Sequence, residues 1–400
     1  MWRISQRIAS IEASPLVALT SKIALLRRGG HDVIDLGIGE PDFDTPDDIK
    51  DAAMAAIRKG ATKYTAMPGT QDLREVIVGK LLAENGLKYP PDQIIVCNGV
   101  KQVIFNAFAA TLDPGDEVIV PTPYWMSYPS IVKLAGGVPV IVECDASDGF
   151  KLDPSKLGNA ITDRTRWLIL NSPSNPTGAV YRAEELRALA NVLHSHPGVG
   201  VLSDDVYEHI RDDLAPLPVI AQAGPDLFER TLIANGVSKA YAMTGWRVGY
   251  GAGPRELIRG MIEVQAQSTS APSSVSQAAA AAALRGPLDE VRRRASIFMT
   301  RRDDVMNWLS RAPLLKMLRP DGAFYGFVDC RPLLGKQTPD DKSLQTDADI
   351  ATWLLESYHV AVLPGSAFGA PGYVRLSFAA STEQLKEACA RIVRACSDLR

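Results

Sequence analysis

Cysteine and histidine are scarce in this chain of 400 residues, which carries five of each. No two cysteines form a C-x-x-C pair, and an odd number without regular spacing argues against a disulfide framework. Cys389 and Cys396 fall on the apolar face of a predicted C-terminal helix, so we interpret them as core residues. The pair His194 and His196 lies two positions apart and does not share one helix face, so no metal site is predicted. A reducing compartment, the cytoplasm, is expected.

Long apolar runs and an excess of positive charge are also missing. No apolar segment approaches the ~20 residues that a membrane-spanning helix needs. The N-terminal sequence MWRISQRIASIEASP lacks the apolar core of a signal peptide. The formal net charge is −3, so no basic surface argues for nucleic acid. We therefore expect neither a membrane nor a nucleic-acid partner, and the length predicts two domains rather than one.

The chemistry of the chain gathers in one segment, Thr231–Gly251, which reads TLIANGVSKAYAMTGWRVGYG. Its first five residues predict a buried strand that Asn-Gly ends, and Trp246–Tyr250 is predicted to be a second strand. Lys239 lies directly after the first strand, beside the hydroxyl of Ser238. Active sites of α/β sheets gather at the carboxyl ends of strands. Lys239 is therefore the predicted catalytic residue.

Lys239 has the neighbours that imine chemistry requires. Partial desolvation and a nearby cation such as Arg247 disfavour the ammonium form, and a neutral amine can form an imine with a carbonyl. Ser238 and Arg247 can hold an anion, and the arginine fork suits phosphate. An amine beside a phosphate cradle is what pyridoxal 5'-phosphate requires. The alternative is a solvated surface lysine, which is the common case for an arbitrary lysine.

Two further predicted strands end in polar side chains. Trp167–Asn171 is a continuous apolar run, as buried parallel strands should be, and Asn175 follows it in a Pro-rich loop. Val199–Ser203 is followed by Asp204, with Tyr207 three residues later. A buried carboxylate is costly unless it is paired, and a protonated pyridine nitrogen would pair with Asp204. Asn175 and Tyr207 can bind a phenolic oxygen, although an Asx-turn residue is the alternative for Asn175.

An anion site and an aromatic side chain follow two more predicted strands. Gln93–Cys97 runs into a glycine turn that opens a helix, and the free backbone amides of Gly99 and Val100 can bind phosphate there. Trp125 follows the strand Glu117–Pro121, and its indole can stack on a pyridine ring. A hydrophobic plug is the alternative for this tryptophan.

One arginine stands alone in an apolar strand near the C-terminus. Arg375 lies within Tyr373–Phe378, where a charged side chain is expensive unless it binds a carboxylate. An internal pair with Asp or Glu remains the alternative. Two other segments carry weaker signals: the loop around Ile38 and Gly39 exposes backbone but could be a plain turn, and Tyr64 could be a packed surface aromatic.

The segment SKAYAMTGWRVGY resembles the lysine segment of the aspartate aminotransferase family, the class I aminotransferases of fold type I. The segments G-x-G-E-P-D-F, P-x-W, N-x-P-x-N-P-T-G and V-R-L-S resemble the same family and follow in its order. The resemblance runs from Asp35 through Phe378. The family more often has Asp-Glu where this chain has Asp204–Asp205, but the first acid carries the role.

The resemblance implies an α/β fold. The large domain, residues 41–285, would hold a mostly parallel seven-stranded sheet, and residues 1–40 with 286–400 would form a small α+β domain with an N-terminal arm. Within this frame we expect Thr45 to cap a helix that has Pro46 at its first position. Leu288–Leu309, rich in arginine, is expected to be a solvated helix that links the domains.

The resemblance also implies roles for individual residues. Lys239 would hold the cofactor and move a proton during transfer of an amino group from an amino acid to a 2-oxo acid, with ping-pong kinetics. Tyr64 would reach across a homodimer interface to the partner's cofactor phosphate, and Trp125 would be the stacking ring. Arg375 would bind the substrate α-carboxylate. The residues expected to contact the substrate are Ile38, Gly39, Lys101, Trp125, Asn175 and Arg375.

The amino donor is expected to be aspartate, with 2-oxoglutarate as acceptor. Lys101 opens the helix after the phosphate turn, and the branch of the family with G-x-K-Q uses this lysine for the distal carboxylate. The alternative is that Lys101 adds charge near the phosphate.

Other activities stay open at this point. One is an aminotransferase for aromatic or neutral amino acids, and another is a fold type I lyase that acts on carbon–sulfur bonds. A regulator with this fold behind a DNA-binding segment is disfavoured, because the chain before Asp35 is short and has no basic helix. The stretch Ala13–Val17 departs from the pattern of relatives that use prephenate.

Overall fold

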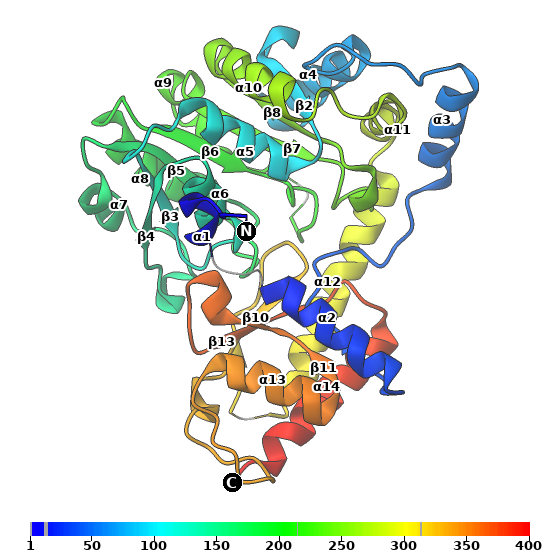
Figure 1. Ribbon diagram of the computed structural model, residues 1–400, viewed down its shortest axis with the longest axis vertical. Helices are drawn as coiled ribbons and strands as arrows, with labels where there is room; N and C mark the ends of the chain where they lie inside the picture. Colours follow the sequence, from blue (N-terminus) through cyan, green and yellow to red (C-terminus); the bar gives the residue numbers. More distant parts are fainter. Residues whose placement is uncertain (1, 12–14, 214, 313) are drawn as a thin grey trace.

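The computed structural model describes residues 2–11, 15–213, 215–312 and 314–400. Figure 1 shows a larger part above a smaller one, with the long helix α12 running between them. The larger part is built on a seven-stranded sheet of order β2-β8-β7-β6-β5-β3-β4. Its strands are β2 (Ile94–Cys97), β3 (Glu117–Pro121), β4 (Val138–Val142), β5 (Thr165–Asn171), β6 (Gly200–Asp204), β7 (Thr231–Gly236) and β8 (Gly249–Ala252).

The sheet is mostly parallel, as the sequence predicts. Strands β4, β3, β5, β6 and β7 pair in parallel, and only β8 runs antiparallel to both of its neighbours. In the register, Asn171 lies opposite Asp204, and Asp204 lies opposite Ala234. The carboxyl ends of β5, β6 and β7 are therefore adjacent, and the polar segments that follow them start from one edge of the sheet.

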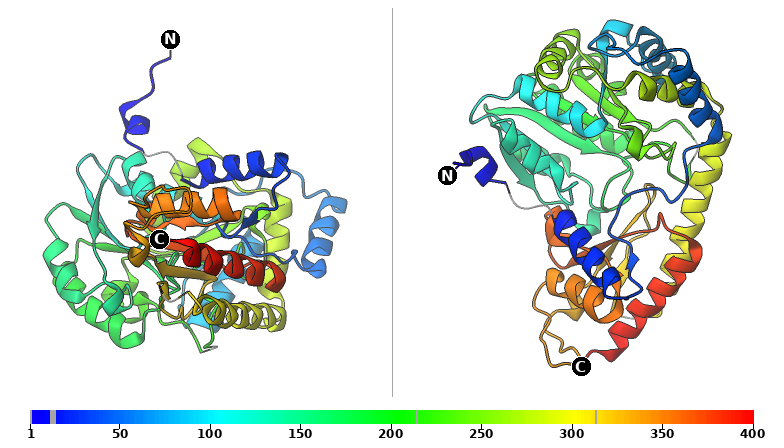
Figure 2. Two further views of the ribbon diagram at one scale, coloured as in Figure 1. Left: turned by 90° about the horizontal axis from the view of Figure 1, so that it is seen from below. Right: turned by 45° about the vertical axis from the view of Figure 1, so that its right-hand side comes forward.

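Helices cover the sheet on both faces (Figures 1 and 2). Helix α4 illustrates how local sequence sets their limits: Thr70 accepts a hydrogen bond from the amide of Leu73, and Gly86 ends the helix with a φ of 65°. Helix α5 is apolar on most of its surface, because it is buried between the sheet and α10. The helices are α3 (Asp47–Arg58), α4 (Gln71–Asn85), α5 (Val100–Thr111), α6 (Ser127–Leu134), α7 (Pro154–Ala160), α8 (Ala183–His194), α9 (Pro225–Phe228), α10 (Arg255–Ser268) and α11 (Ser274–Arg285).

The smaller part combines both ends of the chain. Its antiparallel sheet has the order β12-β13-β10-β9, and a separate parallel pair joins β1 to β11. Ile23, Val33, Leu355 and Ala361 form a shared apolar cluster, which fixes the N-terminal segment against α13 (Figure 2). The elements are α1 (Gln6–Ala9), α2 (Pro15–Arg28), β1 (Ile34–Asp35), β9 (Lys316–Met317), β10 (Tyr325–Asp329), α13 (Asp347–Tyr358), β11 (Val360–Ala361), β12 (Leu363–Pro364), β13 (Tyr373–Ser377) and α14 (Thr382–Asp398).

Helix α12 (Asp289–Leu309) differs from the solvated helix that the sequence predicts. Arg294, Arg301 and Arg302 are buried, and Arg302 has no exposed surface. Arg302 pairs with Asp212 and Asp303 and donates to the carbonyl oxygen of Pro320. The prediction was wrong because a row of arginines can satisfy its charges inside the protein when acids from other segments meet it.

The predicted cap of α3 was also wrong. The helix begins at Asp47, Pro46 is its N-cap, and no side chain caps it. The Thr45 hydroxyl instead donates to the carbonyl oxygen of Ala242 at 2.7 Å and accepts from Trp246 Nε1 at 3.0 Å. The Thr45 hydroxyl, which the local pattern assigns to the helix end, is therefore hydrogen-bonded to residues that are distant in the sequence.

The second strand of the lysine segment starts later than predicted. Residues Thr244–Trp246 form a turn of 3₁₀ helix, Arg247 has a φ of 56°, and β8 begins at Gly249.

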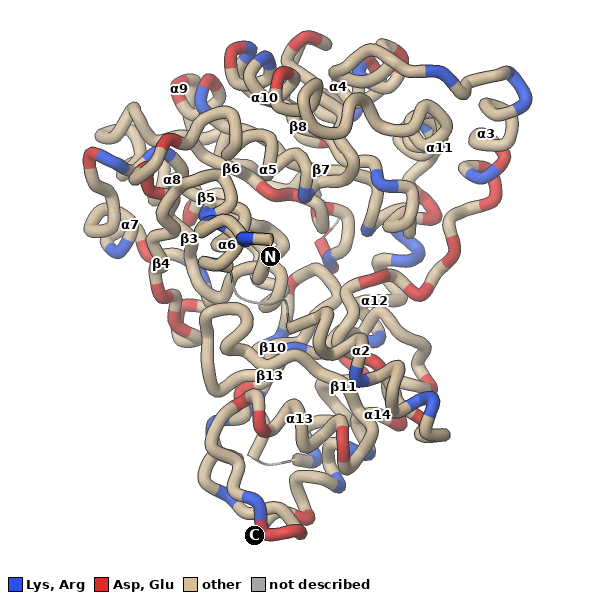
Figure 3. The backbone as a smooth tube through the Cα atoms, in the orientation of Figure 1, with Lys and Arg blue, Asp and Glu red and all other residues tan. Residues whose placement is uncertain are grey.

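Of the helices that the structure describes, none combines the length and the apolar character that crossing a membrane requires. Positive and negative residues are interspersed along both parts of the molecule (Figure 3).

Candidate active site

A cavity of about 280 Å³ lies where the sheet edge meets the smaller part. Among the predicted residues that line it, Gly39 and Arg375 belong to segments of the smaller part, and the others lie at or after the ends of strands of the large sheet. The cavity is lined by most of the predicted site residues, namely Gly39, Val100, Lys101, Trp125, Asn175, Asp204, Tyr207, Ser238, Lys239, Arg247 and Arg375.

Lys239 extends from the turn after β7 into this cavity. Its Nζ donates to the carbonyl oxygen of Gly39 at 2.6 Å. Burial lowers the pKa of the ammonium to about 8, and the cations of Arg375 and Arg247 act in the same direction. A substantial fraction of the amine is therefore neutral at mildly alkaline pH, as a nucleophile requires.

Asp204 ends β6 and is buried together with its hydrogen-bond donors. Tyr128 donates its phenolic hydrogen to Asp204 Oδ2 at 2.6 Å, and the amide of Val206 lies 3.4 Å from Oδ1. Burial raises the pKa of Asp204 to about 6, although both hydrogen bonds oppose the rise. The neighbouring Asp205 bonds to Ser203 at 2.7 Å, and burial raises its pKa to about 8. Asp204 is therefore the more readily ionised of the two acids.

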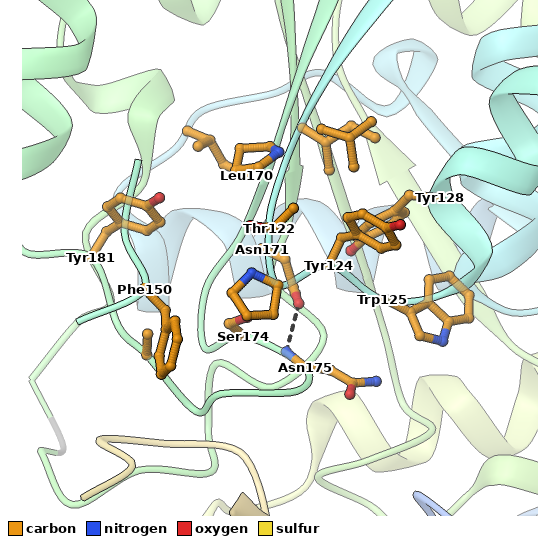
Figure 4. Close-up of a pocket in the computed structure, with 15 residues that line it drawn as sticks. Thr122, Tyr124, Trp125, Tyr128, Phe150, Leu170, Asn171, Ser174, Asn175 and Tyr181 are labelled. Carbon is orange, nitrogen blue, oxygen red and sulfur yellow. Dashed lines mark hydrogen bonds between the residues drawn. The ribbon is translucent and has the colours of Figure 1, made fainter. Parts of the chain in front are cut away.

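Asn175 and Arg375 meet across the two parts. Arg375 Nη1 donates to Asn175 Oδ1 at 3.0 Å, and Nη2 donates to the carbonyl oxygen of Gly37. Both acceptors are neutral, and the buried Arg375 Nε has no hydrogen-bond partner among the described residues. The amide of Asn175 donates to Asn171 Oδ1 at 2.8 Å, which fixes the loop after β5 (Figure 4). The described contacts thus leave Arg375 without the internal carboxylate that the sequence allowed.

A cradle for an anion forms at the start of α5. Gly99 has a φ of 88°, and a Cβ atom there would lie 2.3 Å from Arg247 Nη2. Only glycine allows this close approach of the guanidinium to the backbone. No side chain caps α5, so the amides of Val100 and Lys101 at its start remain available beside the buried Ser238. The amide of Gly99, which the sequence predicted to be free, donates to the carbonyl oxygen of Cys97 at 2.8 Å.

Lys101 and Trp125 form another wall of the cavity. Lys101 Nζ lies 4.8 Å from the centroid of the Trp125 ring. Burial and the charge of Arg247 lower the pKa of Lys101. The Trp125 ring meets the Tyr128 ring edge-on, with centroids 5.3 Å apart. The indole is therefore held in place from both sides.

Three predicted residues do not line the cavity. Ile38 is 39% exposed, and Gly99 contributes through its backbone conformation alone. Tyr64 is 96% exposed, in a loop outside the cavity of its own chain. The expected role of Tyr64 therefore depends on a second chain, and that of Ile38 on movement of its loop.

Several lining residues were missed by sequence reasoning, notably Leu16, Tyr128 and Tyr325. Tyr325 Oη lies 2.7 Å from Tyr207 Oη, and a Cβ atom at Gly39 would lie 2.1 Å from Tyr325 Oη. The glycine of the G-x-G-E-P-D-F segment was thus a signal for a bulky neighbour. Tyr128 follows Trp125 by three residues, and its amide donates to the carbonyl oxygen of Trp125 at 2.9 Å in the turn that opens α6.

A polar cluster lies apart from this cavity. Oxygen and nitrogen atoms of Glu84, Glu208 and His209 lie within 4.8 Å of one another. The buried ammonium of Lys80 already pairs with Glu208 and lies 3.6 Å from Glu84. The protein itself thereby supplies a cation to the two carboxylates of the cluster. His194, which the sequence suggested as a surface residue, pairs with Asp226.

The site fits pyridoxal 5'-phosphate on its own chemistry. An amine with a lowered pKa, a buried acid, a glycine cradle beside a guanidinium and an indole wall surround one cavity. This arrangement on a mostly parallel sheet defines a pyridoxal-phosphate enzyme of fold type I.

Comparison with known proteins places the chain within that class. Residues 31–392 match the family model of aminotransferase class I and II. An aspartate aminotransferase of Rhizobium meliloti strain 1021 is 53% identical over 395 residues, which are 99% of this chain and 96% of the relative. An aspartate/prephenate aminotransferase of Cereibacter sphaeroides is 50% identical over 396 residues, 99% of each chain. The chain belongs to the class I and II aminotransferases, as its motifs predict.

Solved structures agree with this assignment. The crystal structure of the aspartate aminotransferase from Rhizobium meliloti matches with a TM-score of 0.97 at 52% identity and covers 100% of both chains. The aspartate aminotransferase from Thermus thermophilus with maleate matches with a TM-score of 0.90 at 43% identity, covering 99% of this chain and 100% of the other. The predicted fold type I architecture is confirmed.

Proposed function

We propose that this aminotransferase takes aspartate as amino donor and 2-oxoglutarate as acceptor, in a ping-pong reaction. The observation that carries the proposal is a pair of cationic side chains, Arg375 and Lys101, that line one cavity. A dicarboxylic substrate offers one carboxylate to each of them. The names of the relatives from Rhizobium meliloti and Thermus thermophilus support the same donor.

The proposed roles on the cofactor side follow from the geometry of the cavity. When bound, pyridoxal 5'-phosphate supplies an electron sink that stabilises negative charge at the substrate Cα. Lys239 would hold the cofactor and then move a proton between the substrate Cα and the cofactor C4′. Asp204 would pair with the ring nitrogen, while Asn175 and Tyr207 would bind the phenolic oxygen. The phosphate would be held by Ser238, Arg247 and the amide of Val100, and Trp125 would stack on the ring. The amide of Gly99, which the sequence also assigned to the phosphate, already donates to the carbonyl oxygen of Cys97 at 2.8 Å.

On the substrate side, Arg375 would bind the α-carboxylate and Lys101 the distal one. Gly39 lies at the same wall, and Ile38 would close over the substrate if the loop moves. An ammonium on a flexible stem selects geometry less strictly than a guanidinium, so some activity with neutral amino acids is expected.

A screen of amino donors with 2-oxoglutarate as acceptor tests the donor. Aspartate should give the highest kcat/KM, and a maximum with alanine or phenylalanine would reject the proposal. Prephenate as acceptor belongs in the screen, because some relatives are named aspartate/prephenate aminotransferases. The stretch Ala13–Val17 argued against this substrate, but its residues Ala13 and Ser14 lie outside the described residues.

We further propose a homodimer in which Tyr64 serves the partner's phosphate site. Its near-complete exposure outside its own cavity supports this role. Hydrogen bonds from two glutamine side chains hold the loop that carries Tyr64. Gln265 Nε2 donates to the carbonyl oxygen of Met67 at 2.8 Å, and Gln277 Nε2 donates to Thr65 Oγ1 at 3.0 Å.

Complementation between two inactive variants tests the exchange. Mixed dimers of a Tyr64→Ala chain and a Lys239→Ala chain should regain activity, because one site per dimer then has both side chains. Mixed dimers without activity would place Tyr64 in the site of its own chain.

The domain division and the compartment also remain proposals. Pairing of β1 with β11 supports grouping residues 1–40 with residues 286–400, apart from 41–285. Limited proteolysis that releases a stable fragment near these limits would support the division. All five cysteines are buried and unpaired, which suits the cytoplasm. Cell fractionation tests that location.

A further inference from the structure

Tyr128 occupies the boundary between two cavities. It lies in the first turn of α6, and its side chain is 2% exposed. It lines the large cavity and also a side chamber of about 30 Å³ behind it. Figure 4 shows Tyr128 beside Trp125 at one end of this chamber, with Tyr181 at the other end. Nothing in the proposed cofactor contacts uses the Tyr128 hydroxyl.

The hydroxyl has one partner, and that partner is central to the site. Tyr128 Oη donates to Asp204 Oδ2 at 2.6 Å, a short distance typical of a hydrogen bond to a charged oxygen. The other described donor to this carboxylate, the Val206 amide, is 3.4 Å from Oδ1, so this hydrogen bond is weak. Among the described residues, Tyr128 supplies the strong hydrogen bond of the Asp204 carboxylate and leaves Oδ1 nearly free.

The position of the carboxylate makes this bond important. Asp204 is 4% exposed, so water cannot replace a lost donor without entering the core. Burial already raises its pKa to about 6, so each hydrogen bond that stabilises the charged form matters. The titratable groups that face Asp204 are Tyr128 from α6, Asp205 and Tyr207 after β6, and Lys239 after β7. Of these, Tyr128 alone donates a hydrogen bond to it.

We propose that Tyr128 is a positioning residue for the transamination. Its hydroxyl holds Asp204 through Oδ2, keeps the carboxylate ionised, and leaves Oδ1 for the ring nitrogen of the cofactor. The inference rests on the proposed role of Asp204 as the partner of that nitrogen. It adds a residue outside the predicted motifs to the set that determines how firmly the cofactor is bound and how well it acts.

The test compares Tyr128→Phe with Tyr181→Phe. Tyr181 is also buried and lines the same side chamber, but its hydroxyl accepts from the amide of Leu152 at 2.8 Å and contacts no predicted site residue. Each variant is measured for melting temperature, for the Kd of pyridoxal 5'-phosphate with apo-protein between pH 5 and pH 9, and for kcat and KM with aspartate.

We expect Tyr128→Phe to weaken cofactor binding roughly tenfold or more near pH 7, the size expected for loss of a hydrogen bond to a charged group. Because a protonated Asp204 cannot pair with a protonated ring nitrogen, affinity should fall on acidification, and this fall should move to higher pH in Tyr128→Phe. The loss in kcat should exceed any rise in KM for aspartate. Tyr181→Phe should change the melting temperature at most, with the Kd and its pH dependence unaltered.

Measurements in an Asp204→Asn background separate the inference on Tyr128 from the proposed role of Asp204. If Asp204→Asn weakens cofactor binding and Tyr128→Phe adds little further loss in that background, the tyrosine acts through the acid. If Asp204→Asn is damaging but Tyr128→Phe matches the wild type or Tyr181→Phe, the inference on Tyr128 is overturned while the role of Asp204 stands. An Asp204→Asn enzyme with normal cofactor affinity and turnover would overturn both.

Discussion

The two walls of the cavity are assembled in different ways. On the sheet side, Asn171, Asp204 and Ala234 are neighbours in the β-ladder, so the groups after them meet because the strands pair. On the opposite side, Arg375 bonds to the carbonyl oxygen of Gly37, 338 positions away in the sequence. One wall is fixed by the register of a single sheet, and the other by docking of distant segments.

The two walls also differ in charge. The sheet wall combines an acid with an amine, Asp204 and Lys239, whose pKa values burial shifts to about 6 and about 8. The opposite wall presents the guanidinium of Arg375 among neutral oxygens. Loss of Asp204 or Lys239 should therefore abolish chemistry, whereas loss of Arg375 on the opposite wall should weaken binding of substrates.

The largest effect is expected on the sheet wall. Lys239→Ala should lower transamination by about 10⁴-fold or more, because both the covalent anchor and the proton carrier are lost. Borohydride reduction followed by intact-mass measurement should find no cofactor attached to this variant. Lys101→Ser serves as the matched lysine control and should still carry the cofactor. Near-normal turnover of Lys239→Ala would show that Lys239 is not the catalytic residue.

On the opposite wall, Arg375→Leu should reduce kcat/KM for every amino acid by roughly 10²-fold, whatever its side chain. The α-carboxylate is common to all substrates and would lose a charge-assisted pair of hydrogen bonds. Cofactor attachment, measured by the same mass experiment, should remain. Unchanged kcat/KM for aspartate would mean that Arg375 does not bind the α-carboxylate.

Lys101→Ser should have a smaller and selective effect, of about tenfold, on aspartate and glutamate. Alanine and phenylalanine lack the distal carboxylate and should react almost as before. Steady-state kinetics with the four donors decides the point. An equal loss on all four would assign Lys101 to the cofactor phosphate and would remove the main support for aspartate.

The smallest effect concerns the influence of one wall on the other. Capture of pyridoxal 5'-phosphate by apo-protein requires neutral Lys239, so its rate should rise with pH through about 8 and then level. Arg375 lowers the pKa of Lys239, so Arg375→Leu should move this midpoint upward. Stopped-flow absorbance across pH 6 to pH 10 measures both midpoints. A downward shift would exclude direct charge coupling between the walls.

The same contrast explains what the sequence could reveal. The strand Glu117–Pro121 was predicted at the limits that the structure has, because proline and glycine lie at or near its ends. The polar groups after β5, β6 and β7 could be predicted because strand ends of a parallel sheet converge. The residues that were missed depend on contacts between distant segments, as in the bond between Tyr207 and Tyr325, 118 positions apart.

The errors have the same origin. Thr45 fits a helix cap locally but bonds to Ala242. Arg294, Arg301 and Arg302 of α12 appear solvated in the sequence but are buried, and Arg301 pairs with Asp42 at 2.8 Å through both Nη atoms. In each case, partners far along the chain decide the outcome, and neither periodicity nor spacing contains that information.

The carbonyl oxygens of Gly37 and Gly39 have a consequence for ligand selection. They accept hydrogen bonds from Arg375 and Lys239, the two cations proposed to bind the substrate and the cofactor. Each ligand must therefore displace an internal acceptor, and binding becomes an exchange whose free energy is a difference between two acceptors. The free energy of this exchange is favourable for a bidentate carboxylate or a reactive carbonyl, and it is close to zero for a weakly basic anion. The backbone of one short loop thus sets a threshold that ligands must exceed.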